Sequence, residues 1–112
     1  MAVPALSLEV YNHRMPDFRH VDPRELRVPP SRRQGADPAK LARQISLFGR
    51  STVGMPPPWV YEGTDGSLVL YNGVTRATRI AKLAPGTLIQ IEVIGKLPKA
   101  FAADPKIGDL LP

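Results

Sequence analysis

The stretch from residue 70 to residue 83 restricts the fold of this chain more than any other. An apolar run leads into the dipeptide Asn72-Gly73, which by itself would favour a hairpin. The residues that follow repeat with helical spacing instead, and four of them form one apolar face: Ala77, Ile80, Ala81 and Ala84. The sequence therefore predicts a strand, a tight turn and a helix that ends at Pro85-Gly86.

The predicted turn has the residue types of a phosphate-binding site, and five residues are candidates for it: Asn72, Gly73, Thr75, Arg76 and Arg79. The glycine allows a close backbone approach, and the threonine can cap the helix or bond an oxyanion. Arg76 and Arg79 lie in the first turns, where positive charge opposes the helix dipole unless an anion compensates it. The alternative is that both arginines pair with acids such as Asp65 or Glu62, or are solvated.

A second helix is predicted between Asp37 and Gly49. Asp37 is a good N-cap, and Pro38 suits the first helical position. Three apolar residues recur at helical spacing: Leu41, Ile45 and Phe48. We expect this helix to serve mainly the core, with Lys40 and Arg43 facing solvent.

Five segments have the pattern of strands. Residues 6–11 and 25–28 are the weaker candidates. Residues 59–62 and 67–71 flank an Asp-Gly turn and predict a hairpin. Residues 87–94 alternate most clearly and should lie centrally in the sheet or pack beside the helix that follows Gly73. The expected fold class is α+β, with a small mixed sheet, a hairpin and two main helices.

Length and composition favour one small domain. The chain has 112 residues, of which 43% are hydrophobic, and 13 are prolines that predict a loop-rich structure. We expect an N-terminal extension over 1–24, a core domain over 25–95, and a tail over 96–112 that packs on the same domain. The absence of cysteine excludes disulfides and thiolate catalysis. No signal peptide or membrane span is evident, so we expect a cytoplasmic protein with no membrane partner.

The formal charge of +5 favours an anionic partner such as a nucleotide or nucleic acid, although a solvated basic surface would also explain it. Two loops add candidate phosphate ligands to the turn: the guanidinium groups of Arg32 and Arg33, and the hydroxyl groups of Ser51 and Thr52. Paired surface arginines and loop hydroxyls are also common without any ligand.

Four metal-ligand types lie near the N-terminus: His13, Asp17, His20 and Asp22. Their spacing fits no standard metal site, and Pro16 interrupts any helix that would gather them. We therefore interpret this segment as a surface loop and expect no metal there.

The order of elements from residue 26 to residue 94 resembles the N-terminal domain of the ParB/sulfiredoxin-like superfamily. Members have a short strand, a loop with proline and arginine, a helix ending in a pattern like S-I-x-x-x-G, a hairpin, a strand feeding a G-x-x-R turn and helix, and a final strand. Here residues 44–49, Q-I-S-L-F-G, stand near the helix pattern, and residues 73–76, G-V-T-R, match G-x-x-R.

The resemblance implies a nucleotide or nucleic-acid ligand. Val74 stands where sulfiredoxins place their catalytic cysteine, which excludes that reductase chemistry. Val74 and Thr75 replace the glutamate and first arginine of the G-E-R-R that is typical of ParB proteins. We therefore expect a ligand-binding module rather than a complete catalytic turn.

Three functions remain open from the sequence. The first is a binding module for a nucleotide or nucleic-acid phosphate, for which a nucleoside triphosphate with Mg²⁺ is one candidate ligand. The second is a nuclease or nucleotide hydrolase, but nothing places its candidate acids together: Glu62, Asp65 and Glu92. The third is a protein-interaction domain, with a protein partner or a second copy of the chain on its basic loops. No catalytic residue is assigned.

Overall fold

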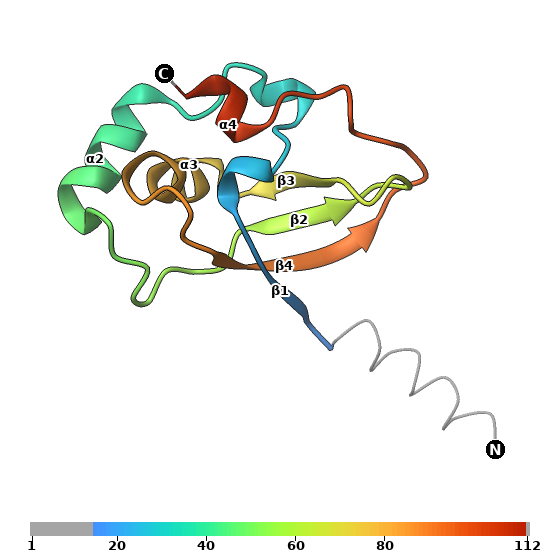
Figure 1. Ribbon diagram of the computed structural model, residues 1–112, viewed down its shortest axis with the longest axis horizontal. Helices are drawn as coiled ribbons and strands as arrows, with labels where there is room; N and C mark the ends of the chain where they lie inside the picture. The colour runs from blue at the N-terminus through green and yellow to red at the C-terminus, as the bar shows by residue number, and fades with distance from the viewer. Residues whose placement is uncertain (1–14, 112) are drawn as a thin grey trace.

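The computed structural model describes residues 15–111, and within them the chain forms a four-stranded mixed sheet with three helices (Figure 1). This confirms the predicted α+β class. The strands are β1 (Asp17–Val21), β2 (Trp59–Glu62), β3 (Leu68–Asn72) and β4 (Ile89–Lys96), in the spatial order β1-β4-β2-β3. Figure 1 shows them side by side, with the helices gathered at the β3 side.

The helices are α2 (Pro38–Phe48), α3 (Val74–Leu83) and the short α4 (Ile107–Leu110), with 3₁₀ turns over Pro23–Glu25 and Pro30–Arg32. Helix α2 begins and ends where the sequence predicts. The Asp37 side chain caps its start by accepting a hydrogen bond from the Lys40 backbone N–H at 3.0 Å, and Gly49 ends it with a positive φ of 55°. None of the three helices is long and apolar enough to cross a membrane.

The sheet joins two antiparallel pairs through one parallel pair. β2 and β3 form the predicted hairpin, β1 pairs antiparallel with β4, and β2 runs parallel to β4. Strand β4 is internal, as its alternating pattern predicts, although it begins and ends two residues later than expected. Such a small displacement at strand ends reflects turn geometry that local patterning does not encode.

The core lies between one face of this sheet and the buried side of α3. Val60, Leu70 and Ile91 of the sheet belong to one buried cluster with Ala77 and Ile80 of the helix. The alanines allow the helix to approach the sheet closely, as the predicted apolar face requires. The segment between the two 3₁₀ turns adds the buried residues Leu26 and Val28 to this core, and α4 adds Ile107.

Three predictions about the elements are wrong. Residues 25–28 form no strand, because Pro23 starts a 3₁₀ turn capped by Asp22 and only Arg27 bridges to other chain segments. No residue of α2 is buried, and Phe48 is 52% exposed, so this helix lies at the edge of the core and not within it. Residues 17–21 belong to a segment that we interpreted as a surface loop, but they form strand β1 and pair with β4. The strand predicted over residues 6–11 lies outside the described residues.

The C-terminal tail contacts the hairpin turn and the chain after the first 3₁₀ turn. Phe101 is 5% exposed, and the Lys99 carbonyl accepts a hydrogen bond from the Thr64 N–H at 2.9 Å. Further along, Val28 N–H donates to the Pro105 carbonyl at 2.9 Å, which ties the tail to the chain after the first 3₁₀ turn. The tail therefore contributes backbone and side-chain contacts to the same body as the sheet.

Candidate phosphate-binding site

The turn between β3 and α3 has the strand-to-helix geometry that the sequence predicts. Gly73 occupies the N-cap of α3 with φ of 102° and ψ of 20°, a left-handed conformation that L-residues with a side chain rarely adopt. No side chain caps the helix, and its first turn contains no acid. The N-terminus of α3 therefore presents backbone N–H groups without a side-chain partner, which is the arrangement that anions favour.

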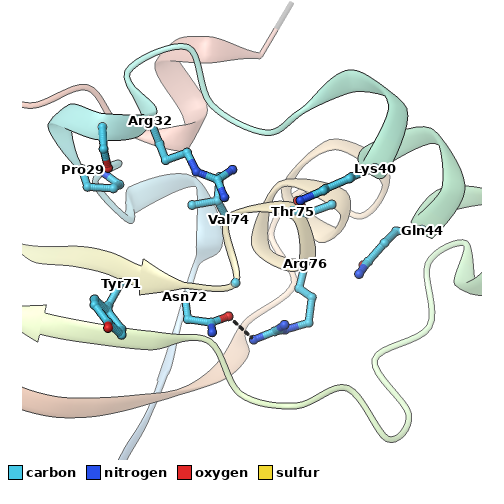
Figure 2. Close-up of a pocket in the computed structure, with 11 residues that line it drawn as sticks. Pro29, Arg32, Lys40, Gln44, Tyr71, Asn72, Val74, Thr75 and Arg76 are labelled. Atoms are coloured by element: carbon cyan, nitrogen blue, oxygen red, sulfur yellow. Dashed lines mark hydrogen bonds between the residues drawn. The ribbon is translucent and has the colours of Figure 1, made fainter.

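A pocket of about 320 Å³ opens at this helix start (Figure 2). Five of the predicted site residues line it: Arg32, Asn72, Gly73, Thr75 and Arg76. The remaining lining residues are Pro29, Ser31, Lys40, Gln44, Tyr71 and Val74. No aspartate or glutamate is among them, so the lining carries only positive formal charge.

Three cations reach the pocket from three different elements. Arg32 comes from the second 3₁₀ turn, Lys40 from α2 and Arg76 from α3. Figure 2 shows the Arg32 and Lys40 side chains directed toward the first turn of α3. Within residues 15–111 the ion pairs involve other groups, Arg19 with Asp17 and Glu62, and Lys106 with Glu25, so these three cations have no carboxylate partner there.

Arg76 is held at the pocket by neutral acceptors. Its Nε donates to the Pro56 carbonyl at 3.1 Å, and its Nη2 donates to Asn72 Oδ1 at 3.4 Å, the bond drawn in Figure 2. Partial burial without a nearby anion lowers the pKa of the Arg76 guanidinium from its ordinary value. The group still carries its charge at neutral pH, and an anion would recover part of the solvation that it has lost.

Arg79, the second arginine of the predicted site, is buried and makes contacts within the protein. It is 2% exposed, and its Nη1 donates to the carbonyls of Gly49 at 2.7 Å and Ser51 at 2.8 Å. Its guanidinium carbon lies 5.4 Å from the centre of the Phe48 ring, and Nη2 contacts Met55 Sδ at 3.3 Å. The arginine therefore ties the loop after α2 to α3 and does not line the pocket.

Three other predicted ligands also lie away from the pocket. Arg33 is exposed but does not line it, although its neighbour Arg32 does. Ser51 and Thr52 belong to the loop that Arg79 holds, and Ser51 Oγ accepts a hydrogen bond from the Val53 N–H at 3.1 Å. Their local turn contacts correspond to the alternative that the sequence left open.

The sequence interpretation missed Lys40 and Gln44 as members of the site. Both lie on α2 four residues apart and therefore on one face of that helix, and both line the pocket. Lys40 is exposed, as expected, and it lines the pocket. The polar pair at helical spacing was the available signal, and only the packing of α2 beside α3 shows which way it faces.

The acids considered for metal binding or hydrolysis lie elsewhere. In the described part of the chain no group of three His, Asp or Glu residues could hold a metal ion. Asp17 and Glu62 bind Arg19, Asp22 caps a 3₁₀ turn, and Asp65 accepts hydrogen bonds from Ser67. His13 lies outside the described residues. The pocket lining therefore supplies hydrogen-bond donors and positive charge that could bind an anion, and it contains no carboxylate that could act as a base.

Comparisons with known proteins add no relative: no protein-family model, no curated protein and no solved structure matches this chain.

Proposed function

We propose that this domain binds the phosphate of a nucleotide or nucleic acid in the pocket at the start of α3. The observation that carries the proposal is the convergence of Arg32, Lys40 and Arg76 on an uncapped helix N-terminus with no acid in the pocket lining. Cations gathered without counter-charges repel one another, and an anion removes that repulsion.

The chemistry of the lining suits a phosphate better than a point anion. Arginine can bond two phosphate oxygens at once, lysine adds a compact charge, and the α3 backbone N–H groups approach from a third direction. Hydroxyl and amide donors are also present at Thr75 and Gln44. A group with several oxygens at tetrahedral positions can use donors that arrive from three elements.

The net charge of +5 supports a nucleotide or nucleic acid as the source of that phosphate. Long-range attraction to a polyanion raises the association rate and depends on salt. The order of elements around the G-x-x-R turn, which resembles that of ParB-like domains, points to the same ligand class. A hydrolytic function has no comparable support, because the pocket lining lacks a carboxylate.

Adjacent arginines give a matched test. Arg32 lines the pocket and Arg33 does not, so Arg32→Ala and Arg33→Ala remove the same charge one residue apart. Binding of a labelled single-stranded 12-mer, measured by fluorescence anisotropy over a range of salt concentrations, should weaken about tenfold or more for Arg32→Ala. The slope of log K against log salt should also fall by about one for Arg32→Ala and much less for Arg33→Ala.

The same assay distinguishes binding at the pocket from nonspecific attraction to the basic surface. Equal losses for the two arginine variants would show that only total charge matters and would overturn the proposed site. A parallel titration with inorganic pyrophosphate by calorimetry should follow the same order of variants, because the proposal places a phosphate group, and nothing else, at the pocket.

A further inference from the structure

The sheet face opposite the core carries exposed aromatic side chains. Alternation puts Val60 and Leu70 in the core and their neighbours Trp59 and Tyr71 on the other face. Trp59 is 43% exposed and Tyr71 is 62% exposed. Two large aromatic side chains that both keep this much exposed area on one sheet face form an apolar patch of the kind that can contact a ligand.

The two rings are stacked with nearly parallel planes. Their planes differ by 8° and their centroids are 6.5 Å apart. The Tyr61 ring meets Tyr71 edge-on, at 5.7 Å and 80°, which supports the exposed ring from the side. Because the pair is pre-positioned by strands and by Tyr61, a flat ligand can stack on it with little loss of side-chain freedom.

This surface is continuous with the phosphate pocket. Tyr71 itself lines the pocket, and the next two residues are Asn72 and the helix-capping Gly73. Figure 2 shows Tyr71 at one end of the pocket, with the three cations beyond it. A ring on Tyr71 and a phosphate beside Arg32 or Arg76 would therefore lie at the same pocket.

Charge on the sheet face orients such a ligand. Phe18 of β1 and Trp59 of β2 are both in register with Glu92 of β4, so a carboxylate separates the two aromatic residues. Phe18 is itself 45% exposed. Glu92 disfavours phosphate over the middle of the sheet, whereas it can accept hydrogen bonds from base amino groups. We therefore expect phosphates at the pocket that follows the end of β3, where the cations lie, and bases on the sheet face that carries Trp59 and Tyr71.

We propose that Trp59 and Tyr71 form a stacking platform for the bases of a single-stranded nucleic acid whose backbone phosphate occupies the pocket. This inference rests on the proposed phosphate site and names its ligand class. Single strands expose base faces that stack on aromatic side chains, whereas bases inside a duplex are already stacked and out of reach. The open, uncovered rings and the further aromatic Phe18 suit a strand that continues across the face.

Trp59 is the only tryptophan in the chain, so its intrinsic fluorescence reports directly on the platform. A single-stranded 12-mer of deoxycytidine should quench this emission in a saturable manner. An abasic 12-mer with the same number of phosphates should bind about tenfold or more weakly and leave the emission unchanged. A hairpin duplex of equal charge and a free nucleotide should both bind more weakly than the single strand.

Two substitutions complete the test. By anisotropy, Trp59→Leu, which lies outside the pocket lining, should weaken binding of the 12-mer about tenfold and leave the affinity for the abasic strand unchanged. Tyr71→Phe should keep the affinity for the 12-mer, because the ring that stacks is retained. Thermal unfolding checks that each variant is folded.

The outcomes separate the two proposals. If the abasic strand binds as tightly as the cytidine strand, the stacking platform is overturned and the phosphate site stands. If duplex or free nucleotide binds more tightly than the single strand, the ligand class is overturned. If neither strand nor pyrophosphate binds, the phosphate site itself fails and the platform with it.

Discussion

Gly73 and Pro58 approach each other so closely that a Cβ on the glycine would lie 2.7 Å from the Cβ of the proline. Pro58 is fully buried and directly precedes β2, while Gly73 directly follows β3, the hairpin partner of β2. The site turn therefore needs glycine for two reasons, its left-handed φ and the proline against it.

Gly73→Ala should reduce the free energy of unfolding by at least about 2 kcal/mol, from left-handed strain together with the contact to Pro58. Gly66 provides the control, because its φ is +80° but no atom lies within 4 Å of a Cβ placed there. Gly66→Ala should cost about 1 kcal/mol. Urea denaturation measures both, and equal costs would mean that the close approach to Pro58 is relieved without penalty.

Arg79→Met should destabilise the domain by about 2–4 kcal/mol, because the carbonyls of Gly49 and Ser51 lose a charged donor inside the protein. Lys82→Met, on an exposed position of the same helix, should change stability by less than about 0.5 kcal/mol. Chemical denaturation compares the two. A small effect of Arg79→Met would contradict the structural role assigned here and return this arginine to the candidates for ligand binding.

Arg19 gives the domain a predictable response to acid. Its guanidinium bonds Glu62 at 2.9 Å and Asp17 at 3.0 Å and thereby lowers the pKa of both carboxyl groups. Since the folded pKa values lie below those of the unfolded chain, the stabilisation is present above about pH 4 and is lost as the pH falls through the folded values.

Arg19→Ala should therefore destabilise the domain at pH 7 and flatten the loss of stability below about pH 4. Thermal melts between pH 2 and pH 7 measure this dependence, with the exposed Arg43→Ala as the control for general charge. Parallel curves for wild type and Arg19→Ala would show that these carboxyl groups titrate alike in the folded and unfolded chains.

Phe101→Ala should cost about 3 kcal/mol, because the ring is 5% exposed and fixes the tail beside the hairpin turn. Phe18→Ala removes the same ring from a position that is 45% exposed and should cost less than about 1 kcal/mol. Differential scanning calorimetry compares the two variants. Similar costs would mean that the tail contributes no more to folding than an exposed side chain does.

Local sequence patterns predicted the elements whose ends are fixed by a capping or turn residue. Asp37 and Pro38 begin α2, the Asp-Gly turn closes the hairpin, and Gly73 begins α3, because capping and positive φ are properties of a few adjacent residues. Strand β1 escaped prediction because its apolar residue Phe18 is 45% exposed, while the next residue, Arg19, pairs with Glu62 on β2. The sequence around Arg19 does not reveal this partner, which lies 43 residues away along the chain.

The sequence by itself determined that this chain has a strand, a glycine turn and an arginine-bearing helix, since these depend on backbone preferences over a few residues. Tertiary structure alone decided which side chains meet there. Arg76 and Arg79 are equivalent in local sequence, yet one faces a pocket with Arg32 and Lys40 while the other is buried against the Gly49 and Ser51 carbonyls. That difference comes from where α2 and its following loop pack against α3. This long-range arrangement cannot be deduced from the three-residue spacing of the two arginines.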